Sequence, residues 1–173
     1  MEAAIGTIET SKLEKVVLAR AVDIEFPEAI DPRLVAARLI DLSANRDGFI
    51  ADLSPAGRPG AMLVGSSPEV LVKRQGSTVS AFPLAGSSPR RALAAEDHLA
   101  GQDLLHSSKD LHEHAFVVDH LRRALTPLCE RLDIPDVPQL ISTNEMWHLG
   151  TPISGTLKDK DLTALELALA VHP

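Results

Sequence analysis

Short segments of strand character follow one another along this chain in adjacent groups, and this order constrains the fold more than any other feature. Their β-branched and alternating residues predict strands over 15–26, 47–53, 61–67, 69–74, 77–85, 138–144 and 146–157. Two of these segments meet across Gln75 and Gly76, which is typical of a tight hairpin. Strands grouped in this way, with helices between the groups, predict an α+β fold with a largely antiparallel sheet.

Helical patterns fill the spaces between the strand groups, over 31–44, 93–132 and 161–173. Asp31 followed by Pro32 supplies an N-cap and a proline at the first helical position. From Leu111 onward the apolar residues recur every three or four positions, which is the stripe of one buried helix face. Pro127 lies inside that stripe and predicts a kink in the helix.

Composition narrows the class of protein. The chain has 173 residues, 45% of them hydrophobic, which is enough to bury a core, and we expect a single domain over residues 1–173. Its net charge of −7, with both signs interspersed, argues against a nucleic-acid partner. The sequence shows neither a signal-peptide pattern nor a run of about 18–20 apolar residues, so we expect a cytoplasmic protein without membrane contact. Cys129 is the single cysteine, which rules out an intrachain disulfide and predicts a small buried side chain.

Three of the titratable side chains within or beside predicted strands are candidates for a functional role. Lys15 shares a strand face with apolar neighbours, and burial of that face would make it a base; alternatively, its long stem reaches solvent from the strand end. Glu69 follows Pro68, which interrupts the strand, so its carboxyl group either enters an apolar cavity as a general acid or lies exposed on an edge strand. His148 either hydrogen-bonds a ligand or is a satisfied histidine within a strand.

The loop LAGSSPRR, residues 84–91, has the composition of an anion-binding turn. Gly86 permits close approach of the backbone, and small residues after a strand can present their N–H groups to a carboxylate or phosphate. Arg90 and Arg91 add positive charge nearby. The same pattern also fits an ordinary loop that leads into the next helix.

Oxygen and nitrogen donors gather early in the second predicted helix. On one continuous helix, His106, Asp110, Glu113 and His114 would share a face. The carboxylates of Asp110 and Glu113 suit a hard cation such as Mg²⁺ better than zinc, which prefers several histidines with another ligand. The alternative is a solvated face on which Lys109 pairs with Glu113 at a spacing of four.

Several short segments occur in an order that matches a family. KVVLAR, GSSPEVLV, LAGSSPRR, SKDLHEH, WHLGTPISG and LAVHP resemble the successive signatures of the chorismate-binding enzymes, and the resemblance runs from Lys12 to the last residue. That family includes isochorismate, salicylate, anthranilate and aminodeoxychorismate synthases. The resemblance implies chorismate as substrate, Mg²⁺ as cofactor and a partial chorismate-binding fold.

The resemblance also implies roles for the matched positions. These are Lys15 as general base, Glu69 as general acid, Gly86 and Ser87 as binders of a substrate carboxylate, Glu113 as a Mg²⁺ ligand and His148 as a pocket-lining residue. Isochorismate formation needs an acid and a base because water must lose a proton as it attacks C2, while the C4 hydroxyl must gain one as it leaves. Mg²⁺ on the ring carboxylate would hold the substrate and withdraw charge.

Within the family, Lys15 together with LAGS resembles the water-adding branch. The WHLGTP segment is more similar to siderophore-pathway isochorismate synthases than to menaquinone ones. Salicylate synthase, which also eliminates pyruvate, is the alternative. Family members are longer, so the resemblance implies an internal fragment truncated at both ends, without a second Mg²⁺ ligand or an arginine for the pyruvyl carboxylate. We therefore expect no turnover from the chain alone, with a non-catalytic remnant as a further alternative and an isochorismatase as the functional partner of the parent enzyme.

Overall fold

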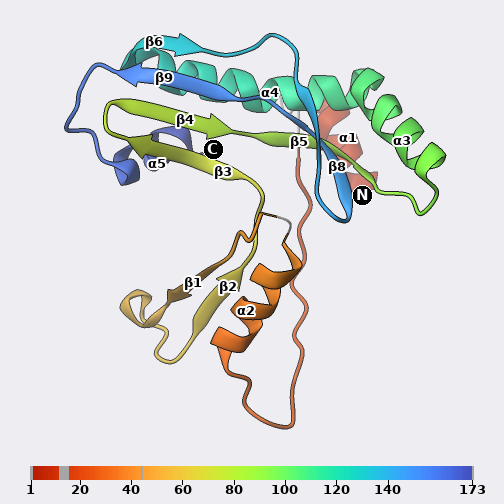
Figure 1. Cartoon of the computed structure of the whole chain (residues 1–173), viewed down its shortest axis with the longest axis vertical. Helices are drawn as coiled ribbons and strands as arrows, with labels where there is room; N and C mark the ends of the chain where they lie inside the picture. The colour runs from red at the N-terminus through yellow and green to blue at the C-terminus, as the bar shows by residue number, and fades with distance from the viewer. Residues whose placement is uncertain (1, 12–15, 44, 173) are drawn as a thin grey trace. The chain divides into compact units, whose positions relative to one another are not determined.

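The computed structural model describes residues 2–11, 16–43 and 45–172 of the chain (Figure 1). Its contacts divide the chain into two compact units, Met1–Ile30 and Asp31–Pro173, and each unit is described by itself. The expected single domain over residues 1–173 stays a prediction. Within the described residues, no helix is long and apolar enough to cross a membrane.

The first unit contains helix α1 (Glu2–Thr10), and its residues 16–30 form neither helix nor strand. The strand predicted over 15–26 is therefore wrong for every residue of it that the structure describes, and Lys15 lies outside the described residues. An alternating segment becomes a strand only where a neighbouring strand bonds its N–H and C=O groups. Its apolar side chains also stay in solvent, because Val17 is 79% and Ile24 69% exposed.

The second unit is built from antiparallel sheets (Figure 1). A two-stranded sheet pairs β1 (Phe49–Asp52) with β2 (Met62–Gly65). A four-stranded sheet has the order β3 (Val70–Gln75), β4 (Thr78–Phe82), β9 (Ile153–Leu157) and β6 (Cys129–Asp133). A three-stranded sheet has the order β5 (Leu84–Pro89), β8 (Met146–Gly150) and β7 (Gln139–Ser142). The described strand pairs are antiparallel, which confirms the predicted α+β class.

The predicted hairpin forms between β3 and β4. Gly76 in its short loop has a φ of 60°, a conformation that glycine adopts at little cost. The strand predicted over 77–85 divides at Pro83, which has no N–H for a ladder: β4 stays in the four-stranded sheet and β5 joins the three-stranded one. The strand predicted over 146–157 divides into β8 and β9 beside Pro152, so the chain changes sheets next to a proline each time.

Helices and short 3₁₀ turns connect these strands: α2 (Pro32–Leu42), η1 (Ser54–Ala56), α3 (Ala94–His106), α4 (Ser108–Leu125), η2 (Thr126–Leu128) and α5 (Ala164–Val171). The predicted N-cap at Asp31 is confirmed, because its carboxylate accepts a hydrogen bond from the Arg33 N–H at 2.9 Å. Helix α2 ends slightly before the predicted boundary. Helix α5 begins later than predicted, at a capping box formed by Thr163 and Glu166.

The single helix predicted over 93–132 is wrong. It divides at Ser107, whose hydroxyl accepts a hydrogen bond from the Asp110 N–H at 3.3 Å and caps α4. Helix α4 then ends at Leu125 instead of kinking at Pro127, because proline has no N–H and its ring collides with the preceding helical turn. The residues that follow form β6, whose pairing with β9 outweighs the helical periodicity of the sequence.

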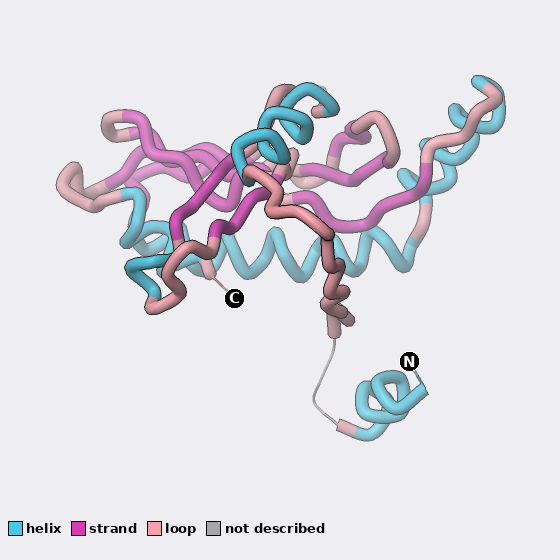
Figure 2. Tube along the Cα trace, turned by 90° about the horizontal axis from the view of Figure 1, so that it is seen from below, coloured by secondary structure: helices cyan, strands magenta, loops and turns pink. Residues whose placement is uncertain are grey.

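Helix α4 lies along one side of the strands of this unit and forms the main core with them (Figure 1 and Figure 2). The buried residues of this core are Val79, Ala81, Leu121, Leu125, Cys129, Ile153, Leu157, Leu167 and Val171. Cys129 is buried, as predicted, although it lies in a strand and not in a helix. Burial raises the pKa of its thiol, and the positive charge of Lys158 offsets part of that rise.

Candidate active site

Strands β5 and β8 bring Ser87 and His148 face to face. The two residues are register partners, and Ser87 Oγ lies 2.8 Å from His148 Nδ1. His148 is half-buried, and burial lowers the pKa of its imidazole, while the negative charge of Glu69 acts in the opposite direction. The ring is therefore neutral near pH 7 and can share a hydrogen bond with the serine hydroxyl.

Glu69 lies where the chain enters β3. Its Oε1 accepts a hydrogen bond from the Leu84 N–H at 3.0 Å, which ties the carboxylate to the first residue of β5. The side chain is exposed, so of the two alternatives the apolar cavity is wrong and the exposed edge-strand position is correct. Pro68 has no N–H for a ladder, so β3 begins only after it and the Glu69 carboxylate lies in solvent. The carboxylate is near enough to His148 to act on its charge, so Glu69, Ser87 and His148 share one neighbourhood.

Gly86 lies in close contact with helix α4 and with Leu149 of β8. Its φ is 84°, and a Cβ added there would lie 3.1 Å from Asp110 Cβ and 3.2 Å from Leu149 Cδ1. A glycine is needed both for the backbone conformation and for the space. Glu113 follows Asp110 at a spacing of three, so it lies one helical turn from this contact and on the same side of α4.

The continuous metal-binding face predicted from the sequence is not formed. His106 belongs to α3, beyond the break at Ser107, and His114 is buried and hydrogen-bonded to the protein. The predicted alternative pair does form: Lys109 Nζ lies 3.2 Å from Glu113 Oε1. Among the described residues, no group of three histidine, cysteine, aspartate or glutamate side chains could hold a metal ion. The described residues of this segment therefore do not form a complete metal site.

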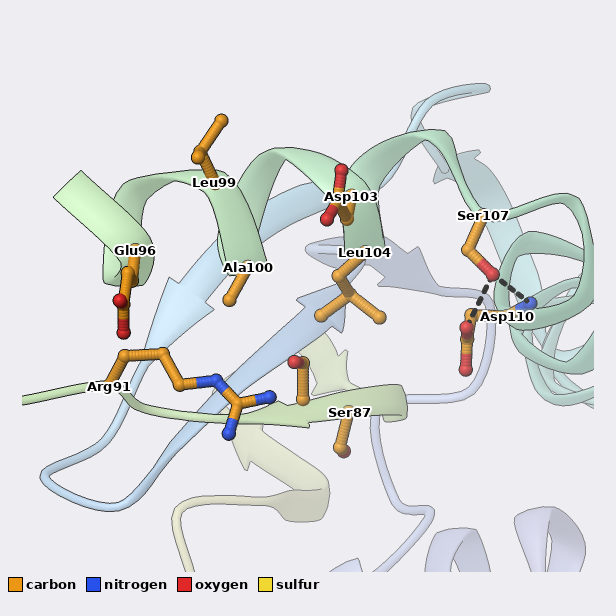
Figure 3. A pocket seen from close by; sticks show the side chains of 10 residues that line it. Ser87, Arg91, Glu96, Leu99, Ala100, Asp103, Leu104, Ser107 and Asp110 are labelled. Carbon is orange, nitrogen blue, oxygen red and sulfur yellow. Dashed lines mark hydrogen bonds between the residues drawn. The ribbon is translucent and has the colours of Figure 1, made fainter.

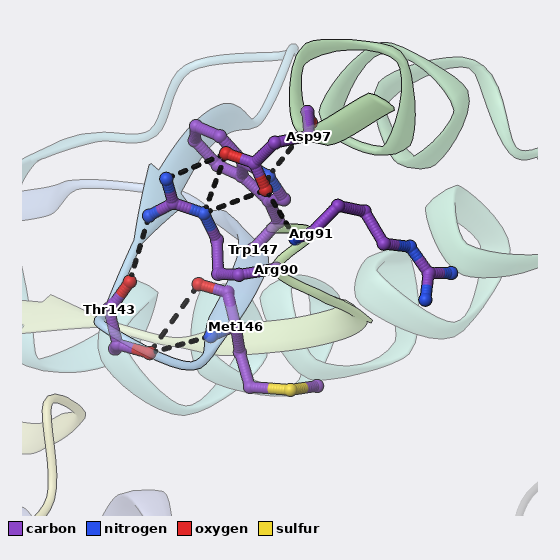
Figure 4. A network of polar contacts seen from close by, with 6 residues as sticks. All are labelled: Arg90, Arg91, Asp97, Thr143, Met146 and Trp147. Carbon is purple, nitrogen blue, oxygen red and sulfur yellow. Dashed lines mark hydrogen bonds and ion pairs between the residues drawn. The ribbon is translucent and has the colours of Figure 1, made fainter. Parts of the chain in front are cut away.

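A polar network at the end of β5 fixes this strand against α3 and β8 (Figure 4). Arg90 pairs with Asp97 at 2.7 Å and lies 4.5 Å from the centroid of the Trp147 ring, and its Nη1 donates to the Thr143 carbonyl oxygen. The Arg90 guanidinium, with the Arg91 N–H, holds the pKa of the Asp97 carboxyl well below its usual range.

The expectation that Arg90 serves an anion in the LAGSSPRR turn is therefore wrong, because its guanidinium is already paired with Asp97. Sequence reasoning missed Asp97 and Trp147 as its partners, since Trp147 lies far along the chain. An aspartate in the first turn of the following helix was the available local signal.

Two hollows flank the Ser87 and His148 pair. The larger, of about 640 Å³, lies between β5, α3 and the start of α4, and is lined in part by Ser87, Arg91 and Asp110 (Figure 3). The smaller, of about 350 Å³, is lined in part by His148 and Pro68. Pockets that hold small molecules usually measure about 300–1,000 Å³, and both hollows fall within this range.

Known proteins are similar in sequence to this chain along most or all of its length. The family model described as "Chorismate binding enzyme" matches residues 1–173. MenF of Mycobacterium tuberculosis is 47% identical over 163 residues, which cover 93% of this chain and 44% of that protein. "Isochorismate synthase DhbC" of Bacillus subtilis is 42% identical over 175 residues, which cover 100% of this chain and 44% of that protein. The chain thus spans less than half the length of these curated relatives.

A solved structure is also similar. The crystal structure of DhbC from Bacillus anthracis, described as a 2,3-dihydroxybenzoate-specific isochorismate synthase, matches with a TM-score of 0.63 and 48% sequence identity. The match covers 65% of this chain and 30% of that chain. The matched 65% of this chain therefore has a counterpart in an experimental structure.

Proposed function

This chain belongs to the family of chorismate-binding enzymes, and from that premise we propose that it supplies one side of the active site of an isochorismate synthase. The hydrogen-bonded pair of Ser87 and His148, with Glu69 held beside it by the Leu84 N–H, carries the proposal. The substrate is chorismate, and the reaction is addition of water at C2 with loss of the C4 hydroxyl. We propose that the parent protein completes the site with residues outside this chain, and that it works in the cytoplasm beside an isochorismatase.

Glu69 is the proposed general acid. Its carboxyl group gives a proton to the C4 hydroxyl as the C4–O bond breaks, so that the group leaves as water and not as hydroxide. Lys15, which lies outside the described residues, is the proposed base that takes a proton from the water attacking C2. One water enters and one leaves, while both ring double bonds shift, so the reaction is an isomerisation. An acid and a base of this kind each contribute about 10²–10⁴-fold to the rate.

Gly86 and Ser87 are the proposed binders of a substrate carboxylate. When the Ser87 hydroxyl donates to that carboxylate, its oxygen is free to accept a hydrogen bond from His148 Nδ1–H. Arg91 lines the adjoining hollow and adds positive charge there (Figure 3). The pair therefore orients the anion, and the neutral ring of His148 keeps the serine hydroxyl in a donating orientation.

Glu113 is the proposed magnesium ligand of this chain. Mg²⁺ binds through one or two carboxylates and keeps waters or substrate oxygens in its other positions, so a single glutamate fits as a partial contribution. The bound ion would neutralise charge on the substrate carboxylate. Glu113 must first exchange its contact with Lys109, which is 3.2 Å away and largely exposed. An exposed ion pair of this kind is weak, so the exchange costs little.

Binding of chorismate by the 173-residue chain tests the proposed carboxylate site. Ser87→Ala should raise the dissociation constant about tenfold, because a hydrogen bond to a charged group is lost. Ser154→Ala is the matched control, since Ser154 is also an exposed strand serine but belongs to the four-stranded sheet. Calorimetric titration should show weaker binding for the first variant alone. Equal affinities for both variants would refute the role of Ser87.

Turnover is a separate test. A coupled assay with isochorismatase should show no isochorismate formation by the 173-residue chain above that of its Lys15→Ala variant. Turnover above this control would show that the chain holds a complete site. In the parent enzyme, salicylate together with pyruvate as products would replace the isochorismate assignment with that of a salicylate synthase.

A further inference from the structure

His114 is a buried histidine that the proposed reaction does not use, and it is held from two sides. The residue is 3% exposed; its Nδ1 lies 3.0 Å from the Ala85 carbonyl oxygen and its Nε2 lies 2.8 Å from Thr151 Oγ1. A carbonyl oxygen can only accept, so Nδ1 must carry the proton. In the neutral ring Nε2 then carries no proton and accepts a hydrogen bond from the Thr151 hydroxyl, so the two partners select one tautomer.

The carbonyl that His114 holds belongs to the irregular part of β5. The register of β5 against β8 shifts between Leu84 and Ser87, so Ala85 and Gly86 lie outside the regular ladder. Gly86 has a φ of 84°, and glycine by itself allows several orientations of the peptide before it. This segment therefore needs a partner beyond β8 if its backbone groups are to keep one direction.

A planar trans peptide links the direction of the Ala85 carbonyl to that of the Gly86 N–H. The C=O and N–H of one such peptide point in opposite directions. Because the Ala85 carbonyl points toward His114 on α4, the Gly86 N–H points away from that helix side chain. Rotation of this peptide would turn the N–H toward His114 and present a carbonyl oxygen where an anion should bind.

We propose that His114 is a positioning residue: its Nδ1–H holds the peptide between Ala85 and Gly86 in the orientation that offers the Gly86 N–H to the substrate carboxylate. The substrate part of this statement rests on the proposed function. We call the hydrogen bond from His114 to the Ala85 carbonyl oxygen the clamp. Thr151 supports it, since Thr151 is buried, contacts Nε2 and donates its own N–H to the Pro83 carbonyl oxygen at 3.4 Å. The clamp thus joins α4 and the segment after β8 to the chain on both sides of Leu84.

The tautomer of His114 in the unmodified chain is the first test. Nitrogen-15 chemical shifts of the ring should show that Nδ1 carries a proton and that Nε2 does not. A ring protonated at Nε2 alone would overturn the proposal, because Nδ1 could not then donate to Ala85. This measurement needs no variant and no substrate, so it decides the point even if a substituted chain fails to fold.

Two isosteric variants separate the two ring nitrogens. The amide nitrogen of His114→Asn can replace Nδ1 and keep the bond to Ala85, whereas that of His114→Gln replaces Nε2 and leaves the carbonyl without it. The Gly86 amide resonance should stay in place in the asparagine variant and move in the glutamine variant. His120→Gln is the matched control, because His120 also lies on α4 and bonds a backbone carbonyl, that of Val171, through Nε2 at 3.1 Å. It should leave the Gly86 amide unmoved.

Chorismate titration completes the test. His114→Gln should raise the dissociation constant about tenfold and His114→Asn by less than about threefold. Equal effects of the two variants on the Gly86 amide would overturn the clamp. If the unmodified chain binds no chorismate while the tautomer and the Gly86 amide behave as stated, the proposed function fails and the clamp stands.

Discussion

Replacement of Gly86 by alanine is the most informative single change at this site, because the structure assigns it two separable costs. The first is conformational: at a φ of 84° a residue with a Cβ costs about 1–2 kcal/mol. The second is steric, since the new Cβ would lie 3.1 Å from Asp110 Cβ and 3.2 Å from Leu149 Cδ1. Overpacking of this kind costs about 1–3 kcal/mol. Gly86→Ala should therefore lower the free energy of unfolding by about 2–5 kcal/mol.

Gly76→Ala separates the two costs. Gly76 has a φ of 60°, but a Cβ added there would meet nothing within 4 Å. It should lose only the conformational part, about 1–2 kcal/mol. Urea unfolding followed by circular dichroism measures both variants, and an unchanged m-value shows that the comparison is valid. Equal losses in the two variants would refute the close approach of α4 to β5 at Gly86.

Four further outcomes are expected. Leu125→Ala, at 0% exposure, should lower the free energy of unfolding by about 2–5 kcal/mol in urea, whereas Leu169→Ala, at 70% exposure, should change it by less than about 0.5 kcal/mol. Glu69→Gln removes the charge that raises the pKa of His148, so NMR titration should give a lower pKa, and a rise would contradict the described geometry. Because burial already lowers that pKa, protonation of His148 opposes folding, and stability should fall as pH drops below about 6.5. The pKa of Asp97 is lowered, so its contribution to stability is complete above about pH 4 and is lost as pH falls further. Asp97→Asn should therefore lower the melting temperature at neutral pH and weaken the dependence of that temperature on acid pH. An unchanged melting temperature would contradict the network of Arg90, Asp97 and Trp147.

Features with a local cause could be predicted from the sequence. The Asp31 cap and the hairpin at Gly76 depend on a few neighbouring residues, and both are confirmed. Antiparallel pairing also follows for the strands that are joined by short connections, which are β1 with β2, β3 with β4 and β7 with β8. Such features need no knowledge of distant contacts, which is why residue type and spacing suffice.

Features that depend on distant partners could not be predicted in this way. The segment 16–26 alternates like a strand, yet no described strand pairs with it. Residues 129–133 continue a helical stripe, yet pairing with β9 makes them a strand. The sequence suggests that the Arg90 side chain is available to an anion, but in the structure it contacts Asp97 and Trp147. In each case tertiary contacts override the local pattern.

The site shows the same division. Residue types along the chain indicate an acid, an anion-binding turn and a carboxylate ligand, but not their surroundings. The structure places Glu69 in solvent and pairs Ser87 with His148 across strands that are far apart in sequence. The sequence suggests His114 as a member of a metal-binding helix face. In the structure it is hydrogen-bonded instead to the Ala85 carbonyl oxygen of β5 and to Thr151.

Transfer of this chain into a complete relative tests the central claim most directly. The matching segment of Bacillus subtilis DhbC, 42% identical over 175 residues, can be replaced by this chain, and the products formed from chorismate identified. Our expectation is isochorismate as the product, with loss of activity when Glu69→Gln is introduced in the same chimera. A folded chimera that leaves chorismate unchanged, or one that releases salicylate and pyruvate, would contradict it.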